Sequence, residues 1–295
     1  MHKLFKLKTN NQFESKYSRE IHSFLENALY EDFGEEDHTS RSYFNNKSDN
    51  SFKLITKSNC IISGIRLSEI LISKFRSNLS INNFYQDGDH VKKGKTIMEI
   101  RGPSYSILSI ERLMLNILQR MSGISTLTSN LSKLISHTKC KILDTRKTTP
   151  CFRYPEKWAV LIGGGLNHRM GLFDAILIKD NHIDSCGSIE NAIVSTKDYL
   201  DQNNLKLPVY IEVRNREELG EVIKHNWIDR IIIDNMSPVE TKESVSFIQG
   251  RFPIESSGNI NEKNITEYAE AGVDFVSMGS ITHSAPIIDM SIIKV

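Results

Sequence analysis

Residues 209–240 read VYIEVRNREELGEVIKHNWIDRIIIDNMSPVE, and this stretch decides the fold class. Two short apolar runs, 209–211 and 230–233, are typical of β-strands, and residues 216–224 between them follow a helical pattern. Residues 237–240 (Ser-Pro-Val-Glu) form a capping box with proline at the first helical position, so a further helix begins there. An alternation of strand and helix predicts parallel strands joined by right-handed crossovers.

The same alternation extends on both sides of this stretch. No short sequence repeat accompanies it, which argues against a solenoid. The sequence therefore predicts an α/β domain with further strands over 141–143, 175–178, 252–254 and 275–278, and further helices over 188–200, 237–248 and 262–271.

The N-terminal part of the chain has a different composition. Residues 1–110 are rich in Asn, Ser and Lys and contain one helical period, over 18–30. Asp87-Gly88-Asp89 has the composition of a turn between strands. A small α+β domain fits this region, and a long helical pattern over 110–134, with Ser122-Gly123 as its weak point, follows it. The short strands expected in this domain are 52–55, 60–62 and 96–100.

The charge balance argues against some classes of protein. Lys and Arg total 37 against 36 Asp and Glu, which gives a formal net charge of +1. A general nucleic-acid binder would show a basic excess. No apolar run approaches the roughly 18 residues that a membrane span needs, and no apolar signal-peptide segment follows the lysines near the N-terminus. We therefore expect a cytoplasmic protein without nucleic-acid or membrane partners.

The four cysteines, Cys60, Cys140, Cys151 and Cys186, are scattered and form no CxxC pair. No histidine lies at zinc-finger spacing from them, which argues against a structural zinc site. Four thiols do not staple a chain of this length, so we expect them to be reduced.

Polar residues follow every strand that the sequence predicts in the α/β region. In an α/β barrel the C-terminal ends of the strands converge on the active site, so these residues would line one polar mouth. The alternative is an open Rossmann-type sheet with solvated strand ends. We favour the barrel because no GxGxxG motif opens a helix after the first strand. The strand ends are 144–147, 179–182, Glu212, 234–235, 255–258 and 279–280.

The residues of this mouth predict an anionic substrate that carries phosphate. Cations grouped around a cavity suit a substrate with several negative charges, because arginine binds carboxylates through two parallel hydrogen bonds. Two neighbouring carboxylates suit a hydrated Mg²⁺. Small donors after the last two strands match the usual phosphate site of barrels. The cations are Arg146, Lys147, His168, Arg169 and Lys179, the carboxylates are Glu212 and Asp234, and the donors are 256–258 and 279–280.

Each of these features has a simpler interpretation when it is taken alone. Arg146 and Lys147 would suit a solvated loop, and the glycines at 163–165 would suit a flexible turn. His168 on its own is more often a satisfied or surface histidine than a catalyst. Residues 234–237 would suit an ordinary helix entry. The combination of all of them favours the functional reading.

Three motifs in the same order resemble one enzyme family. Residues 144–150 (DTRKTTP) resemble its DTRKTTPG signature, and residues 163–172 and 177–182 resemble its next two motifs. The family is nicotinate-nucleotide pyrophosphorylase (carboxylating), also called quinolinate phosphoribosyltransferase. The resemblance covers nearly the whole chain, with further matches at 31–34, 116–124, 233–236 and 272–286.

The resemblance implies a type II phosphoribosyltransferase. Such an enzyme converts quinolinate and phosphoribosyl pyrophosphate into nicotinate mononucleotide, pyrophosphate and CO₂, with Mg²⁺ and without an organic cofactor. The resemblance also implies the role of each site residue. Arg146, His168, Arg169 and Lys179 match the quinolinate pocket, with Arg112 lent by the neighbouring subunit; Lys147, Glu212 and Asp234 match the positions that face phosphoribosyl pyrophosphate and its metal; Ser257, Gly258, Gly279 and Ser280 match the 5′-phosphate loops.

The fold that the resemblance implies is an incomplete α/β barrel with an N-terminal α+β open-sandwich domain. We expect the N-terminal domain to span 1–115, with the C-terminal tail, 284–295, joining it. The barrel would span 116–283. The family also implies a homodimer, or a higher oligomer, with active sites shared between subunits.

Three residues depart from the family pattern. Cys151 stands where the family usually has glycine, which points to a different turn after Pro150. Arg214 stands where an acidic residue is common. Asn259 replaces the second glycine of a phosphate loop, and asparagine tolerates positive φ. Two alternative functions stay open: a paralogous phosphoribosyltransferase for another aromatic acid, and a barrel that binds anions without turnover.

Overall fold

The structure is a computed structural model that describes residues 12–43, 49–76 and 78–295. The chain forms two compact units. The first unit contains the described residues up to Ser129 together with Thr148–Gly164 and Ile281–Val295. The second unit contains Asn130–Lys147 and Gly165–Ser280. The domain boundaries expected from the sequence stay a prediction, because compact units need not coincide with domains.

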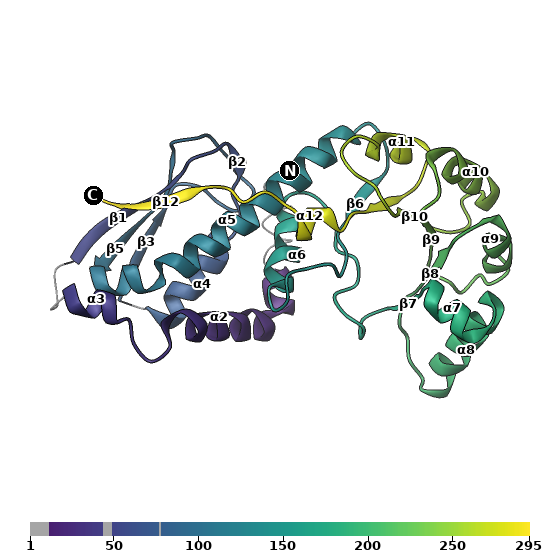
Figure 1. Cartoon of the computed structure of the whole chain (residues 1–295), viewed down its shortest axis with the longest axis horizontal. Helices are drawn as coiled ribbons and strands as arrows, with labels where there is room; N and C mark the ends of the chain where they lie inside the picture. The colour runs from purple at the N-terminus through teal and green to yellow at the C-terminus, as the bar shows by residue number, and fades with distance from the viewer. Residues whose placement is uncertain (1–11, 44–48, 77) are drawn as a thin grey trace. The chain divides into compact units, whose positions relative to one another are not determined.

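The first unit is built on a four-stranded antiparallel sheet with the strand order β12-β1-β5-β3. Strand β12 pairs with β1 in a register that runs from Phe52 opposite Lys294 to Thr56 opposite Met290. Figure 1 shows the yellow β12 lying along the purple β1. The last strand of the chain thus completes a sheet whose other members all lie before residue 104. The strands are β1 (Asp49–Thr56), β3 (Ser80–Asn83), β5 (Thr96–Pro103) and β12 (Met290–Lys294), and a separate pair joins β2 (Cys60–Ile61) to β4 (His90–Val91).

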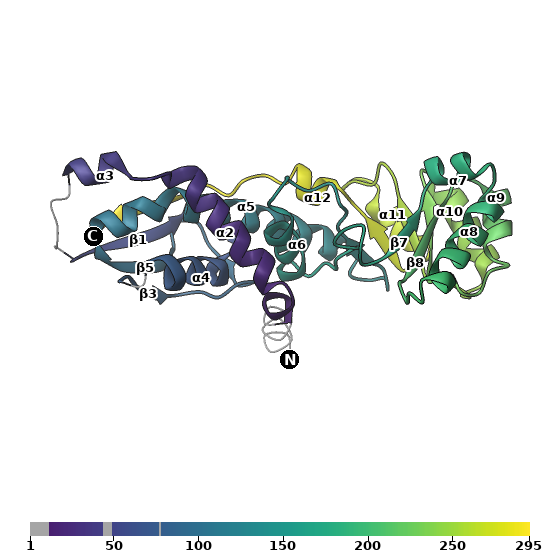
Figure 2. The ribbon, with the colours of Figure 1, turned by 90° about the horizontal axis from the view of Figure 1, so that it is seen from below.

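Helices α4 and α5 lie beside this sheet in both views (Figures 1 and 2). Helix α4 buries Leu67 and Leu71, and the sheet buries Leu54 and Ile97, so the core of the first unit lies between them. The helices predicted from the apolar period over 18–30 and 110–134 are confirmed as α2 and α5. The helices of this unit are α2 (Ser18–Phe33), α3 (His38–Tyr43), α4 (Ile65–Phe75), α5 (Ser104–Leu134), α6 (Arg153–Ile162) and α12 (Ser280–His283), of which α5 and α12 cross a unit boundary.

Helix α5 is continuous through Ser122-Gly123, which the sequence had marked as its weak point. A Cβ atom on Gly123 would lie 1.9 Å from the carbonyl oxygen of Pro286. Gly123 therefore allows the C-terminal segment to cross the helix closely, and it does not break the helix.

The second unit is a six-stranded parallel sheet with the strand order β6-β11-β10-β9-β8-β7. The strands form an arc, and helices α7 to α11 cover its outer side (Figure 1). Strands β6 and β7 stand at the two ends of the order and do not pair with each other, so the unit is an incomplete α/β barrel, as predicted. The strands are β6 (Lys141–Leu143), β7 (Ile176–Ile178), β8 (Val209–Val213), β9 (Arg230–Asp234), β10 (Ile254–Ser257) and β11 (Phe275–Ser277), and the helices are α7 (Asp180–Cys186), α8 (Ile189–Gln202), α9 (Arg216–Val222), α10 (Pro238–Ile248) and α11 (Ile265–Glu270).

Two local predictions can be compared with the structure residue by residue. The capping box of α10 is present: the Glu240 N–H donates to Ser237 Oγ at 3.3 Å, and the Ser237 N–H donates to Glu240 Oε2 at 2.8 Å. Strand β10 begins two residues later than predicted and continues to Ser257. Proline has no N–H for a strand ladder, so Pro253 stands before the strand and the serines extend it.

Among the helices that the structure describes, none combines the length and the apolarity required to cross a membrane.

Candidate active site

The C-terminal ends of the second unit's strands lie at one edge of the sheet, because all six strands are parallel. This edge carries eleven of the twelve site residues predicted from the sequence, and Arg112 is the exception. Arg146 and Lys147 follow β6, His168 and Arg169 follow a β-bridge between Leu143 and Leu166, Lys179 follows β7, Glu212 lies in β8, Asp234 ends β9, Ser257 and Gly258 lie at the end of β10, and Gly279 and Ser280 follow β11.

Arg169 is a buried cation with an unused hydrogen-bond donor. Its side chain donates from Nη1 to the Ala175 carbonyl oxygen at 3.0 Å, whereas its buried Nε has no partner among the described residues. Burial lowers the pKa of the guanidinium, and the nearby charge of Arg146 lowers it further. The positive charges of Arg146 and Arg169 repel each other, and an anion bound by both guanidinium groups would offset that repulsion.

His168, the residue before Arg169, is fixed on three sides. Its backbone N–H donates to Asp144 Oδ1 at 2.9 Å, and its ring Nδ1 accepts from the backbone N–H of Arg169 at 2.8 Å. Its Nε2 lies 3.6 Å from Glu255 Oε2, and the ring meets Tyr210 edge-on. The imidazole is therefore part of a preorganised site and is not a surface histidine.

Lys179 and Glu212 form an ion pair in which Nζ lies 2.5 Å from Oε1. Glu212 is 8% exposed, and burial raises the pKa of its carboxyl while the hydrogen bond from Lys179 opposes the rise. The charge of Asp234 adds to the rise, which places that second carboxylate nearby. The site thus pairs one cation with two acidic side chains.

The two acidic side chains fit a magnesium ion that arrives with its substrate. Magnesium takes one or two protein carboxylates and fills its other positions with water and phosphate oxygens. In the described part of the chain, no three His, Cys, Asp or Glu residues cluster as a metal cage would require. Glu212 and Asp234 are thus two carboxylates that could hold a Mg²⁺ whose other positions are filled by water and phosphate oxygens.

The loops after β9 and β10 contact each other where the sequence departs from the family. Asn259 has a φ of 52°, so it adopts the left-handed conformation expected of asparagine at this position. Its Nδ2 donates to Asn235 Oδ1 at 3.1 Å. A Cβ atom on Gly258 would lie 2.1 Å from the same oxygen, so glycine is needed there.

The other two departures are also accommodated. Cys151 has a φ of 61°, a left-handed conformation that glycine adopts easily, and whether the turn after Pro150 differs from the family's stays a prediction. Arg214 is paired with Glu218 at 2.6 Å and with Asp184 at 2.9 Å. Its charge is balanced by these two carboxylates.

Arg112 belongs to the first unit and is exposed on α5. It lines a cavity of about 870 Å³ formed by α2, α5 and residues 149–154. It makes no ion pair with any described residue. Three acidic residues, Glu20, Glu31 and Asp32, line the same cavity.

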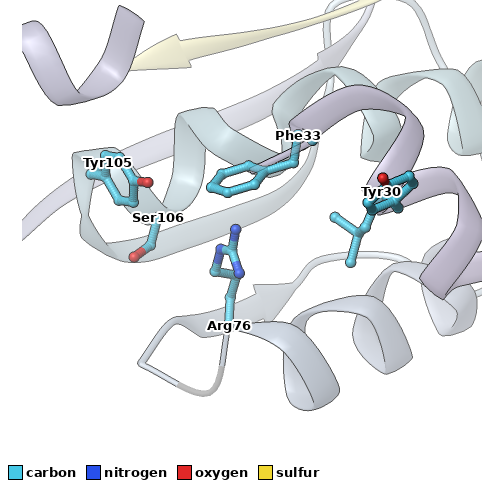
Figure 3. Close-up of a pocket in the computed structure, with 7 residues that line it drawn as sticks. Tyr30, Phe33, Arg76, Tyr105 and Ser106 are labelled. Carbon is cyan, nitrogen blue, oxygen red and sulfur yellow. The ribbon is translucent and has the colours of Figure 1, made fainter. Parts of the chain in front are cut away.

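A smaller cavity of about 390 Å³ in the first unit contains none of the predicted site residues. Figure 3 shows Phe33, Tyr105 and Arg76 around it. The Arg76 guanidinium lies 5.3 Å from the centroid of the Phe33 ring and donates to the Phe75 carbonyl oxygen and to Ser109.

A buried ion pair holds the end of the DTRKTTP loop, and the sequence patterns did not single it out. Glu156 is fully buried and accepts from the Thr149 N–H at 3.0 Å and from Arg120 Nη2 at 2.9 Å. Arg120 also donates to the carbonyl oxygens of Thr282 and Ala285. The pair therefore links three segments that resemble the family, 116–124, 144–150 and 272–286, through residues that all belong to the first unit.

The incomplete barrel and its cationic strand ends define an α/β-barrel enzyme that acts on anionic substrates. Two family models match the chain: "Quinolinate phosphoribosyl transferase, N-terminal domain" over residues 37–122, and "Quinolinate phosphoribosyl transferase, C-terminal domain" over residues 124–293. The chain belongs to the quinolinate phosphoribosyltransferase family, and the enzyme class predicted from the sequence is confirmed.

Individual relatives agree with this assignment. The chloroplastic nicotinate-nucleotide pyrophosphorylase [carboxylating] of Arabidopsis thaliana is 41% identical over 252 residues, which cover 81% of this chain and 72% of the relative. A probable enzyme of the same name from Bacillus subtilis is 35% identical and matches 92% of both chains. The structure of the nicotinate-nucleotide pyrophosphorylase from Francisella tularensis superposes with a TM-score of 0.86 at 39% identity, covering 94% of this chain and 96% of that one.

Proposed function

We propose that this enzyme transfers the phosphoribosyl group of phosphoribosyl pyrophosphate to quinolinate and releases CO₂. The products would be nicotinate mononucleotide and pyrophosphate. The observation that carries the proposal is the buried Arg169, whose Nε lacks a partner among the described residues and whose neighbour is a second arginine, Arg146. The names of the relatives, which specify the carboxylating reaction, support quinolinate over another aromatic acid.

Quinolinate carries two carboxylates on one ring, and the cations of the site suit that charge. Arg146 and Arg169 would each bind a carboxylate through paired N–H donors. Lys179 follows β7, which stands at the other end of the strand order from β6, and it would bind the second carboxylate. His168 would complete the pocket. The burial of Arg169 and His168 keeps water away and strengthens each of these interactions.

Phosphoribosyl pyrophosphate would bind across the ends of β6 and β8 to β11. The backbone donors at Ser257, Gly258, Gly279 and Ser280 suit its 5′-phosphate. Glu212 and Asp234 would hold the Mg²⁺ that accompanies the pyrophosphate, and Lys147 would bind the pyrophosphate itself. A bound Mg²⁺ would offset the negative charge that builds on the departing pyrophosphate.

The transfer step builds positive charge on the ribose carbon as the pyrophosphate departs. Glu212 would stabilise that charge, because a preorganised carboxylate gains most where the charge develops. Loss of CO₂ then leaves a carbanion beside the positively charged ring nitrogen. The dry, cationic pocket favours that step, so the chain's own residues can account for it without an organic cofactor.

We also propose that the enzyme is at least a homodimer in which Arg112 of one subunit completes the pocket of its partner. Support comes from Arg112, which is exposed on α5 and forms no ion pair with a described residue. A cytoplasmic location stays a prediction. The relatives named above include a chloroplastic enzyme.

The test is quinolinate-dependent release of CO₂, measured with and without phosphoribosyl pyrophosphate. We expect release only when both substrates are present, with nicotinate mononucleotide as the second product. Turnover of nicotinate in place of quinolinate would instead indicate a paralogue. Tight quinolinate binding without CO₂ release would indicate a binding protein, and either result would overturn the proposal.

A further inference from the structure

Two buried carboxylates, Asp144 and Glu255, hold the segment Asn167–Arg169 from opposite sides. We propose that they are positioning residues, which fix the orientation of His168 and Arg169 for binding of the substrate's carboxylates. The proposal rests on the proposed function in one respect: it takes His168 and Arg169 as substrate-binding residues. The sequence patterns assigned no role to either carboxylate.

Asp144 satisfies both of its oxygens with donors from this one segment. It is fully buried at the end of β6. Oδ1 accepts the His168 N–H at 2.9 Å, and Oδ2 accepts Nδ2 of Asn167 at 2.5 Å. The backbone N–H of Asp144 also donates to the carbonyl oxygen of Leu166, the residue before the segment. Asp144 therefore contacts this part of the chain both as a donor and as an acceptor. A carboxylate is required here, because an asparagine would turn an N–H₂ group toward one of the two donors.

Glu255 holds the other side of the segment through the imidazole of His168. It is 1% exposed, and its Oε2 lies 2.9 Å from Arg230 Nη1 and 3.6 Å from His168 Nε2. Ser277 donates a further hydrogen bond to the carboxylate. Burial raises the pKa of Glu255, and the charge of Arg230 opposes that rise. Charged and neutral donors thus converge on one buried acid.

Arg230 is itself held in place by two aromatic rings. Its guanidinium lies 4.6 Å from the centroid of the Tyr210 ring and 4.3 Å from that of Phe275. Guanidinium groups stack favourably on aromatic faces. The carboxylate of Glu255 is therefore fixed by a cation that cannot move without disturbing the core of the sheet.

The hydrogen bonds also define the tautomer of His168. Its Nδ1 accepts from the Arg169 N–H at 2.8 Å, so the proton of the neutral ring is on Nε2. Nε2 lies 3.6 Å from Glu255 Oε2, which is an electrostatic contact and not a hydrogen bond. The imidazole thereby links the buried carboxylate to the backbone of Arg169, whose Nη1 is bound to Ala175 and whose Nε has no described partner.

The consequence is a guanidinium presented in one orientation before the substrate arrives. Binding then costs less conformational entropy, and the donors stay aligned with the carboxylates of the substrate. Loosening either carboxylate would affect the quinolinate half of the reaction first. The segment that both carboxylates contact, Asn167–Arg169, contains none of the groups that would bind phosphoribosyl pyrophosphate.

The experiment uses the full chain and the variants Asp144→Asn and Glu255→Gln. Glu221→Gln is the matched control, because Glu221 is a half-exposed acid of the same unit whose one ion pair in the described chain is with Lys224. We expect each test variant to raise KM for quinolinate at least about tenfold, since misplacement on the order of 1 Å can cost about 100-fold. KM for phosphoribosyl pyrophosphate should stay within about twofold of the wild-type value. The control should change neither.

A spectroscopic readout tests the proposal apart from activity. In ¹⁵N-detected NMR of the wild-type chain, His168 should be in the Nε2–H form, and His168→Gln identifies its signals. In Glu255→Gln the two tautomers should become mixed, because the amide can present its N–H₂ group to Nε2.

Three results would overturn the proposal: a wild-type His168 with its proton on Nδ1, an equal rise in both KM values, or a loss of kcat alone. The last two would describe a merely structural role. If one variant does not fold, the other variant and the wild-type spectrum still decide. A wild-type chain without quinolinate-dependent CO₂ release would refute the proposed function, and the tautomer of His168 would still be measured.

Discussion

Arg169 is buried, its Nε has no partner among the described residues, and the positive charge of Arg146 lies nearby. An anionic ligand would accept a hydrogen bond from Nε and offset both positive charges. We predict that Arg169→Ala weakens quinolinate binding by about 2–5 kcal/mol, the cost of truncating one partner of a buried, hydrogen-bonded charge pair. Titration calorimetry with quinolinate measures the change directly. Arg216→Ala is the control, because Arg216 is an exposed arginine stacked over Phe247 on the outer side of the unit. Equal affinity in the wild type and in Arg169→Ala would remove Arg169 from the pocket.

The pair Glu212 and Asp234 leads to a prediction about metal. Because their charges interact and the substrate carries a pyrophosphate, catalysis should require Mg²⁺ or Mn²⁺. Dialysis against excess EDTA should abolish CO₂ release, and added Mg²⁺ should restore it. Undiminished turnover in EDTA would contradict the role given to both carboxylates.

The cysteines provide a prediction from burial and pKa. Burial raises the pKa of the Cys60 thiol and raises that of Cys140 to about 12, so both stay protonated at pH 8. Only the thiolate is nucleophilic. Two thiols per chain, Cys151 and Cys186, should therefore react quickly with a thiol reagent, and four should react after unfolding. Fast reaction of all four in the native protein would show that the buried pair is accessible.

At the level of single residues, the sequence predicted the charges of the site but not what holds them. Arg146, Arg169 and Lys179 stand in motifs whose spacing is visible in the chain. The buried carboxylates Asp144 and Glu255 could not be assigned, because which donors face a buried acid depends on contacts between distant segments. At Asn259 the tolerance of asparagine for positive φ was enough, and its φ of 52° agrees.

The helices allow a matched test of two glycines. Gly123→Ala should lower the free energy of unfolding by about 1–3 kcal/mol, because its Cβ would overlap the Pro286 carbonyl oxygen. Gly220→Ala in α9 should raise it by about 0.5–1 kcal/mol, because no atom lies within 4 Å of the new Cβ and alanine favours the helix. Urea denaturation of both variants measures the difference. A stabilised Gly123→Ala would mean that Gly123 is not needed for the close crossing.

Apolar runs and helical periods predicted the six strands of the second unit and missed helix α6 and strand β12. The strands of the second unit are short, mostly buried apolar runs separated by helical stretches, so their positions follow from the sequence. Helix α6 is buried on nearly all sides, and its buried residues include Glu156 and Lys157, charged side chains that are normally expected at the surface. Strand β12 is short and half exposed, and its partner β1 is far away in the sequence, so no local pattern indicates it.

At the scale of the whole molecule, shared active sites would make two inactive chains complement each other. If Arg112 serves the partner's pocket and Arg146 its own, then Arg112→Ala and Arg146→Ala homodimers should both be nearly inactive. Unfolding and refolding them in equal amounts makes about half of the dimers hybrids, each with one intact site, by twofold symmetry. Activity should return to roughly a quarter of the wild-type value.

The controls are the two homodimers refolded separately, which should recover nothing. If Arg112 serves its own chain, every site keeps one lesion and the mixture stays inactive. If Arg112 only solvates the surface of α5, the Arg112→Ala homodimer should be as active as the wild type. One assay thus distinguishes the three arrangements.

The pairing of β12 with β1 has a consequence for the order in which the chain is made. All six strands of the parallel sheet lie between residues 141 and 277, so that sheet needs no residue after 277. The antiparallel sheet cannot be completed until residues 290–294 have emerged. Until then β1 presents an unpaired edge, the kind of surface on which nascent chains associate wrongly. The part of the protein that is translated first is therefore the part that is finished last.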